Sequence, residues 1–393
     1  MTRHTPENDA LWAGHDAEFR DPHEVVVQWQ SAAAFDSSLL DATITGPWWD
    51  LLDSLGITLF VTREYEHLLT ALATHRGSPR TSYLRLPHPN GLAFDEKRGR
   101  LIVASTRNPN IVFDFAPALG AAPGASASER RQYRGVLLPV RARYLPGSLY
   151  LHDLAIVGGR LHGCAAGINA VVTLPDTGGF SPVWWPQSLE RQASKPRFER
   201  NYLQLNSIAA GATLGSSFFT ASAARPGRRR PGDPDFPVDG RGVLFSGRKR
   251  TVVAQGLTRP HSARLWRRRV WLDNSGYGEF GAVTAGKFEA VARLPGWTRG
   301  LCFSGDIAFI ATSRVIPRFR QYAPGLDVDR SVCGVHAVDP KSGTTLASVT
   351  WPRGNQIFAV EAVPSNWTRG LPFSRDQPTD ERFLRNLFSR AVC

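Results

Sequence analysis

The chain has 393 residues, of which 42% are hydrophobic and 21% are charged, and its formal net charge at pH 7 is +13. This balance excludes a chain that is disordered along most of its length. Because the length exceeds that of a usual single-core domain, the chain either divides into domains or arranges a repeated unit around a shared core. No run of 18 uninterrupted apolar residues occurs, so we expect no membrane-spanning helix and no membrane partner.

Arginine supplies most of the positive charge, since the chain has 42 Arg and five Lys. Three basic runs stand out, at Arg228–Arg230, Arg248–Arg250 and Arg267–Arg269. Clusters of this kind can attract anions, including nucleic acid. The first two runs carry none of the aromatic residues that single-strand binding uses, so we expect solvated loops and no nucleic-acid partner.

Two features favour a cytoplasmic location. The N-terminal residues lack the basic-then-apolar order of a secretory signal. The four cysteines, which are Cys164, Cys302, Cys333 and Cys393, are scattered and form no CxxC pair. We therefore expect free, buried thiols rather than a disulfide framework or a zinc ribbon.

The N-terminal part of the chain leads into the first predicted strands. Residues 1–47 are interpreted as an extension. The segment 48–76 carries an apolar strand over Ile57–Val61 between two amphipathic stretches. We predict that this segment supplies outer strands that close a ring of sheets.

A unit repeats between residues 80 and 365: a polar residue, a short strand rich in β-branched residues or Leu, a turn, and a second strand. Five copies have this form and the sixth keeps only its first strand. The copies start at Asn90, Asp153, Asn206, His261, Arg299 and Ala359, at intervals of 63, 53, 55, 38 and 60 residues. These intervals fit four-stranded blades with loops of uneven length, so we predict an all-β, six-bladed β-propeller over residues 48–366.

Two segments interrupt the repeats and are predicted to be loops, namely Pro117–Arg134 and Ala224–Asp239. The remaining residues 367–393 are interpreted as a tail. Within it, Gln377–Cys393 places its apolar residues on one side of a short amphipathic helix. We expect this helix to cap the propeller or to mediate contact between copies in a homo-oligomer.

The first residues of the six copies are the main candidates for a functional site. The innermost strand of each blade runs along the central channel, so equivalent positions converge on the axis. We predict a ring formed by Asn90, Asp153, Asn206, His261, Arg299 and Ala359. One interpretation is that polar residues simply solvate a water-filled channel. The other is a binding or catalytic site for a small-molecule substrate, because an imidazole, a carboxylate, a guanidinium and two amides meet there.

Further residues can join this ring. His88 lies two residues before Asn90 and so shares its side of an extended chain, whereas His152 is expected to point into a blade interface. Tyr277 lies at a strand end beside the blade of His261. Glu361 can supply a second carboxylate deeper in the channel.

Three mechanisms fit these residues. A divalent cation (Ca, Mg, Zn or Fe) bound by Asp153, Asn90, Asn206 and His261 can act as a Lewis acid, although Arg299 disfavours a neighbouring cation. Without metal, His261 acts as acid or base, Asp153 orients it, and Arg299 clamps a carboxylate or phosphate. In the third, the same groups and the candidate substrate-binding residues bind a small molecule without turning it over.

Several motifs resemble a family of uncharacterised bacterial propellers that carry a domain of unknown function. The resemblance spans Trp48–Val363 and rests on the motifs LLDSLGITLFVT, HDLAIVGGRLHG, LNSIAAG, LTRPHSARLW, WLDNSGYGEFG and LPGWTRGLCFSGDIAFIATSR. It implies the propeller fold and no particular reaction. Where the resemblance leads us to expect an aromatic–Asp pair in the last blade, the chain has Phe358-Ala359. More distantly, the chain is similar to six-bladed gluconolactonase and regucalcin-type propellers, which hold a divalent cation with Glu, Asn and Asp.

We therefore interpret the chain as a propeller enzyme, a hydrolase, lyase or isomerase of specialised metabolism that acts on a small polar or anionic metabolite. The alternative is a non-catalytic module that binds a ligand or uses its arginine-rich loops to bind a protein.

Overall fold

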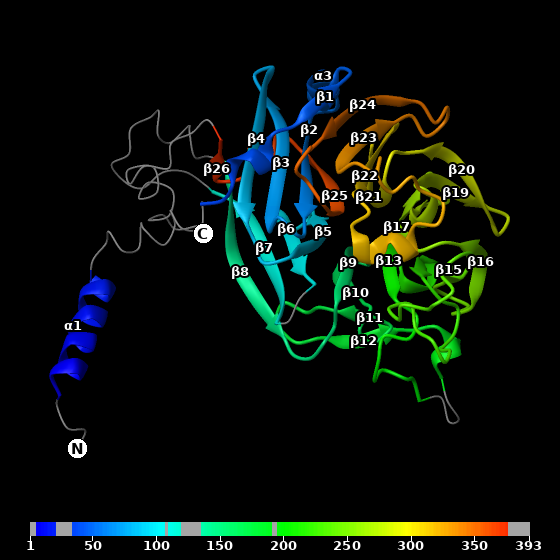
Figure 1. The fold of residues 1–393 in the computed structure, drawn as a ribbon, viewed down its shortest axis with the longest axis horizontal. Coiled ribbons are helices and arrows are strands. Elements are labelled where there is room, and N and C mark those ends of the chain that lie inside the picture. The colour runs from blue at the N-terminus through cyan, green and yellow to red at the C-terminus, as the bar shows by residue number, and fades with distance from the viewer. Residues whose placement is uncertain (1–4, 21–33, 107–108, 119–134, 191–194, 376–393) are drawn as a thin grey trace.

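The computed structural model of the chain describes residues 5–20, 34–106, 109–118, 135–190 and 195–375. Its strands form six antiparallel sheets that are arranged as the blades of a β-propeller (Figure 1). The predicted fold class is confirmed. The predicted helix over Gln377–Cys393 lies outside the described residues.

Each blade runs from the channel outward. Blade 1 contains β25 (Ile357–Pro364), β2 (Ile57–Arg63), β3 (Leu68–His75), β4 (Ser78–Arg85) and β26 (Phe373–Ser374). Blade 2 contains β5 (Pro89–Asp95), β6 (Arg100–Ser105), β7 (Asn110–Pro117) and β8 (Leu137–Leu145). Blade 3 contains β9 (Leu151–Val157), β10 (Arg160–Ala165), β11 (Ala170–Thr173) and β12 (Ser181–Trp184).

The remaining blades follow in chain order. Blade 4 contains β13 (Leu205–Ala209), β14 (Phe218–Ala221), β15 (Gly242–Ser246) and β16 (Val252–Leu257). Blade 5 contains β17 (Pro260–Trp266), β18 (Arg269–Asn274), β19 (Glu279–Thr284) and β20 (Lys287–Arg293). Blade 6 contains β21 (Trp297–Ser304), β22 (Ile307–Ser313), β23 (Gly334–Val338), β24 (Thr345–Thr350) and β1 (Thr43–Thr45).

The ring closes by pairing the two ends of the propeller sequence in blade 1. Strand β25, the first strand of the sixth copy, pairs antiparallel with β2, with Val360 opposite Val61. In Figure 1 the blue strands β2–β4 and the orange-red β25 lie side by side. The prediction that segment 48–76 supplies strands that close the ring is therefore confirmed. Strands β1 and β26 add to the edges of blades 6 and 1 from outside residues 48–366.

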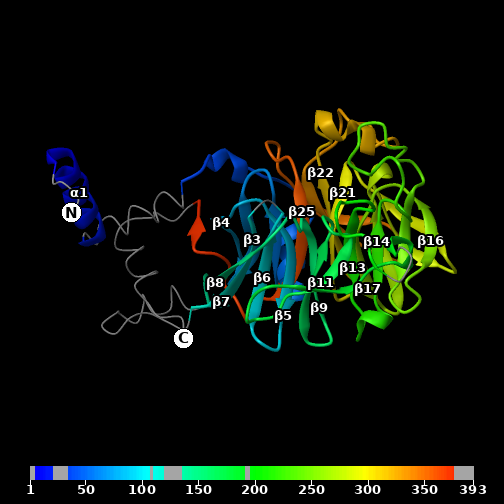
Figure 2. The same ribbon diagram turned by 90° about the horizontal axis from the view of Figure 1, so that it is seen from below.

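Helical elements lie outside the sheets, and all of those described except α1 are short. They are α1 (Pro6–Arg20), η1 (Ser37–Leu40), α3 (Trp48–Leu55), η2 (Gln187–Leu189), η4 (Leu214–Ser216), η5 (Ser275–Tyr277) and η6 (Pro317–Tyr322). In Figure 2 the gold turns that include η6 stand on one face of the propeller. No helix in the described ranges is both long and apolar enough to cross a membrane.

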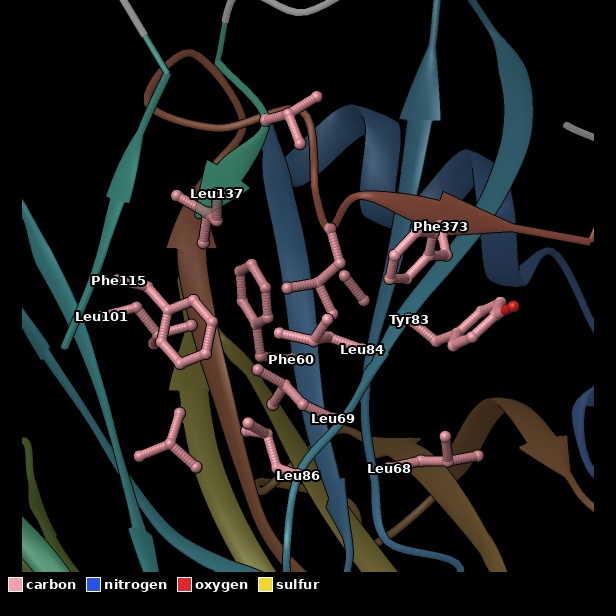
Figure 3. Close-up of a cluster of buried hydrophobic side chains, with 14 of the residues drawn as sticks. Phe60, Leu68, Leu69, Tyr83, Leu84, Leu86, Leu101, Phe115, Leu137 and Phe373 are labelled. Atoms are coloured by element: carbon pink, nitrogen blue, oxygen red, sulfur yellow. The ribbon is translucent and has the colours of Figure 1, made fainter. Parts of the chain in front are cut away.

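Apolar side chains fill the spaces between neighbouring blades. Figure 3 shows the core between blades 1 and 2, where Phe60 and Leu84 face Leu101 and Phe115. Because both faces of a blade are covered, the side chains of a central strand are buried on both sides. All seven residues of β2 are buried, for example.

Every innermost strand contains a β-bulge near the position where its repeat begins. In each of the six blades the register against the second strand slips by one residue. The bulges lie at Asn90–Gly91, His152, Asn206, Ser262–Ala263, Arg299–Gly300 and Phe358–Ala359. A bulge places two residues opposite one and turns a side chain away from the strict alternation of a strand.

A buried histidine in blade 6 links the stability of the fold to pH. The Nε2 atom of His336 lies 3.0 Å from Thr312 Oγ1, and burial lowers the pKa of His336 to about 4. Because this pKa lies below that of an unfolded histidine, the associated stability is present above about pH 6.5 and is lost as the pH falls toward 4.

We expect the free energy of unfolding to fall by about 2 kcal/mol more in the wild type than in His336→Gln between pH 7 and pH 5. Denaturant unfolding of both proteins at the two pH values measures this difference. Equal losses in the two proteins would show that His336 is not protonated on unfolding in this range.

Candidate functional site

Most polar residues of the predicted ring join neighbouring blades. The side-chain amide of Asn90 donates to the carbonyl oxygen of Leu151 in blade 3, and its Oδ1 accepts from the backbone N–H of Gly91. Asn206 Nδ2 donates to the carbonyl oxygen of Pro260 in blade 5 at 2.9 Å. Such bonds satisfy backbone groups that the bulges release from the sheets.

Similar bonds complete the circle around the channel. Thr62 Oγ1 in blade 1 donates to the carbonyl oxygen of Asn90 in blade 2 at 2.7 Å. Ser262 Oγ in blade 5 accepts from the backbone N–H of Gly300 in blade 6 at 2.7 Å. Ser313 Oγ in blade 6 bonds to the backbone of Ile357 in blade 1 at 3.1 Å. Asn90, which the sequence predicts to bind a substrate or a metal, therefore uses both its amide atoms in hydrogen bonds within the fold.

Asp153 forms an ion pair across the channel. Arg264 of blade 5 donates to its two carboxylate oxygens at 2.8 and 3.2 Å. The backbone N–H groups of Leu154 and Ile208 donate to the same carboxylate, each at 3.0 Å. Although burial opposes its charge, the attraction of Asp153 raises the pKa of Arg264. A cavity of about 10 Å³ adjoins the pair, room for no more than about one water molecule.

The donors in this ring do not fit a divalent cation. Asp153 already neutralises Arg264, and Arg299 lies beside the same small cavity. Asn206 Oδ1 is buried with no partner among the described residues, but one amide oxygen is a poor site for a hard cation. Across the described part of the chain, no cluster of three or more His, Cys, Asp or Glu side chains suits a metal ion. The predicted metal site at these residues is therefore not supported by the donor set.

A large cavity opens at one mouth of the channel, above the ring. Its volume is about 790 Å³. The inner strands and the segments before them line its floor, and two long connections form its rim, at 222–241 in blade 4 and 314–333 in blade 6. The charged residues on its wall are Arg259, Arg299, Arg318, Arg320 and Glu64. The cavity is therefore rich in positive charge.

Two of these arginines are buried and stack on aromatic rings. Arg299 is 6% exposed, and its guanidinium carbon lies 3.2 Å from the centre of the Phe358 ring. Arg259 lies 4.0 Å from the centre of the Tyr322 ring and donates to Gln204 Oε1 at 2.6 Å. Burial lowers the pKa of Arg299 to about 9 and that of Arg259 to about 10.

Neither buried guanidinium forms an ion pair within the part of the chain that the structure describes. Among the described residues, no carboxylate lies within ion-pair distance of Arg259 or Arg299, and the Nε atoms of both lack a hydrogen-bond partner. The charge of Glu64 attracts Arg299 and partly offsets the effect of burial on its pKa. A buried, uncompensated charge is costly, so these positions favour an anion in the cavity.

His261 lies beside both guanidinium groups. Its Nδ1 is 2.8 Å from the carbonyl oxygen of Arg259 and 2.9 Å from Ser275 Oγ. A carbonyl oxygen only accepts, so Nδ1 carries the proton and Nε2 carries the lone pair. Burial, followed by the charges of Arg299 and Arg259, lowers the pKa of His261 well below its usual value. The predicted role of Asp153 in orienting His261 is corrected, because Arg259 and Ser275 orient the ring.

The structure separates the other predicted residues from this cavity. The ring of His88 packs edge-to-face on His67, with centres 4.3 Å apart. His152 lines the cavity instead, because it is the extra residue of the bulge in blade 3. Tyr277 donates to Asp239 at 3.0 Å and lies outside the cavity. Glu361 lines a different cavity at the opposite mouth.

Several lining residues were not predicted from the sequence. Gln356 is fully buried, lines the cavity, and has no partner among the described residues for either amide atom. Arg259 stands two residues before His261, in the same motif. Tyr322 belongs to η6 in a long connection, where no periodic pattern indicates its position. Phe358, which departs from the aromatic–Asp pair expected in the last blade, has its ring stacked against the guanidinium of Arg299.

Several solved structures are similar to this chain. A chain of a nidogen/laminin complex has a TM-score of 0.50 and 11% identity, and the match covers 79% of this chain and 99% of that one. A gluconolactonase from Xanthomonas campestris has a TM-score of 0.43 and 15% identity, and the match covers 76% of this chain and 86% of that one. A regucalcin from Agrobacterium tumefaciens has a TM-score of 0.41 and 13% identity, and the match covers 66% of this chain and 73% of that one.

At 11% identity, the match to the nidogen/laminin chain shows similarity of fold alone. No curated protein sequence matches the chain. A family model described as a domain of unknown function (DUF4915) matches residues 46–369, and the chain belongs to this family.

Proposed function

We propose that the protein is an enzyme that binds a small anionic metabolite in the cavity of about 790 Å³ and acts on it by acid–base catalysis, as a hydrolase, lyase or isomerase. The observation that carries this proposal is the pair of buried, unneutralised guanidinium groups of Arg259 and Arg299 beside the neutral imidazole of His261. A carboxylate or phosphate supplies the negative charge that these arginines lack.

The aromatic rings favour a ligand that also has an apolar or planar part. Trp297, Phe319, Tyr322 and Phe358 line the cavity beside the arginines. Apolar walls with a few convergent polar groups are typical of small-molecule sites. The buried amide of Gln356 would pair with a substrate group that both donates and accepts hydrogen bonds.

Binding of an anion would also prepare His261 for proton transfer. Two positive neighbours disfavour the imidazolium in the free protein. A bound anion offsets their charge and raises the pKa of His261 toward neutrality. Its Nε2 could then take a proton from water or from a substrate carbon next to a carboxylate, while Arg259 and Ser275 hold the ring at Nδ1.

The protein-interaction alternative has less support from the arginine runs. Arg229 and Arg230 pair with Asp235 and Asp233, each at 2.9 Å. Arg250 pairs with Glu190 at 2.5 Å. Local pairing of this kind reduces the charge that a run offers to a partner.

The His261→Gln variant separates binding from turnover. We expect ligand affinity within about threefold of the wild type and turnover lower by about 10²–10⁴-fold, because glutamine keeps a polar side chain but removes the base. A panel of carboxylates and phosphate esters, ranked by thermal shift and followed by NMR for product formation, identifies the substrate for this measurement. His75→Gln, at an exposed histidine at the end of β3 and outside the cavity, is the matched control and should keep the turnover of the wild type.

Unchanged turnover in His261→Gln would contradict the catalytic assignment. If the wild type bound a ligand but formed no product, the protein would be a ligand-binding propeller and not an enzyme.

A further inference from the structure

The channel has a second cavity, of about 350 Å³, at the mouth opposite to His261. All six innermost strands, or the residues that directly follow them, contribute to its wall. The wall is mostly apolar and includes Leu92, Phe94, Ile156, Ile208, Trp266 and Phe303. The rings of Trp266 and Phe303 stack in parallel, with centres 4.6 Å apart. This surface suits the apolar body of a small molecule.

Two charged side chains line this cavity, and they are not equivalent. The guanidinium of Arg264 already forms two hydrogen bonds with Asp153. Glu361 has no hydrogen bond or ion pair with another described residue. Because Asp153 neutralises Arg264, the carboxylate of Glu361 leaves this mouth with an excess negative charge.

We propose that this cavity is a second ligand site, which takes a small apolar molecule carrying a primary ammonium group. The ammonium pairs with the Glu361 carboxylate, and the apolar body packs on Trp266 and Phe303. The Asp153–Arg264 pair separates this site from the cavity of His261, so the two sites bind their ligands independently.

The titratable groups around Glu361 set the pH dependence of this site. They are Arg264 on β17, Asp153 on β9 and Cys302 on β21. Burial raises the pKa of Glu361 to about 7, and burial keeps Cys302 a neutral thiol by raising its pKa well above the usual value. An ammonium favours the ionised carboxylate, so its affinity increases as the pH rises through 7.

Fluorine NMR titration with 4-fluorobenzylamine tests the site, with 4-fluorobenzyl alcohol as the neutral probe. We expect the wild type to bind the amine at least about tenfold more tightly than the alcohol at pH 8. Glu361→Gln removes this preference. Ala210→Phe fills the cavity from its rim without changing its charge, and should weaken both probes. Glu289→Gln, at an exposed carboxylate on β20, is the control and should bind as the wild type does.

Equal affinity for amine and alcohol in the wild type would overturn the proposal. So would a preference for the amine that survives Glu361→Gln, or binding that is lost in Arg299→Met and retained in Ala210→Phe. The last result would assign the amine to the cavity of His261.

Discussion

Replacing Asp153 with alanine is expected to lower the free energy of unfolding by about 3–5 kcal/mol. The change leaves the guanidinium of Arg264 without its carboxylate. Because only 18% of that side chain is exposed, water cannot fully replace the lost partner. It also removes the acceptor for the backbone N–H groups of Leu154 and Ile208. Denaturant unfolding at pH 7, with the denaturant slope compared between wild type and variant, measures the loss.

A double variant distinguishes a structural ion pair from a ligand site. In Asp153→Leu/Arg264→Met both charges are replaced by apolar side chains of similar size, and such replacements are often close to neutral. We expect the double variant to recover the part of the loss that comes from the unpaired guanidinium, whereas the backbone N–H groups of Leu154 and Ile208 still lack their acceptor. A loss below about 1 kcal/mol in Asp153→Ala would contradict the role of this pair in joining blades 3 and 5.

The architecture could be predicted from the sequence because each blade corresponds to a local sequence pattern that repeats along the chain. Each copy pairs a polar start residue with a short apolar strand, and the intervals fit one blade per copy. The incomplete sixth copy predicted that another segment closes the ring, and β2 and β3 do so. The sequence did not show that β1 and β26 add further edge strands, since these are only three and two residues long.

The candidate site was predicted less well, because the bulges break the alternation used to assign side chains to a face. An extra residue in blade 3 brings His152 to the cavity, whereas strict alternation favoured His88. The partners of Asn90 and Asn206 are carbonyl groups of neighbouring blades, 61 and 54 residues away in the sequence. The spacing of residues along the sequence does not reveal partners in other blades. The sequence therefore predicts that these two side-chain amides bind a metal or a substrate, although they bond to the fold itself.

The sequence also does not show which charged side chains pair with each other in the fold. Asp153 is predicted from the sequence to bind a metal or to orient His261, but Arg264, 111 residues later, neutralises it. By contrast, His261 and Arg299 were predicted to lie together, and both line the same cavity. Repeat position alone was not sufficient, because Asn90, Asp153 and Asn206 hold the same position in their copies and do not line this cavity.

Replacing Arg299 with methionine is expected to weaken binding of an aromatic carboxylate by at least about thirtyfold. Methionine retains the packing on Phe358 but removes the charge and the N–H donors that meet the anion. Calorimetric titration with 4-bromobenzoate measures the change. Arg248→Gln, an exposed arginine outside the cavity, is the control and should bind as the wild type does.

The same variant should not lose stability. The pKa of Arg299 is lowered to about 9 by burial, below that of an unfolded arginine. Its charge therefore opposes folding at pH 7, by roughly a few kcal/mol, and removing it relieves this cost. We expect the Tm of Arg299→Met to equal or exceed that of the wild type. A large fall in Tm would assign Arg299 to the framework of the propeller rather than to a binding site.

The central claim is that an anion binds between Arg299, Arg259 and His261. Crystals soaked in 4-bromobenzoate test it directly, because the bromine gives an anomalous signal at the position of the ligand. We predict a bromine peak among the aromatic rings of the cavity, with the carboxylate on the two guanidinium groups. Bromine only at exposed arginines such as Arg228 and Arg248, with the cavity empty, would contradict the account.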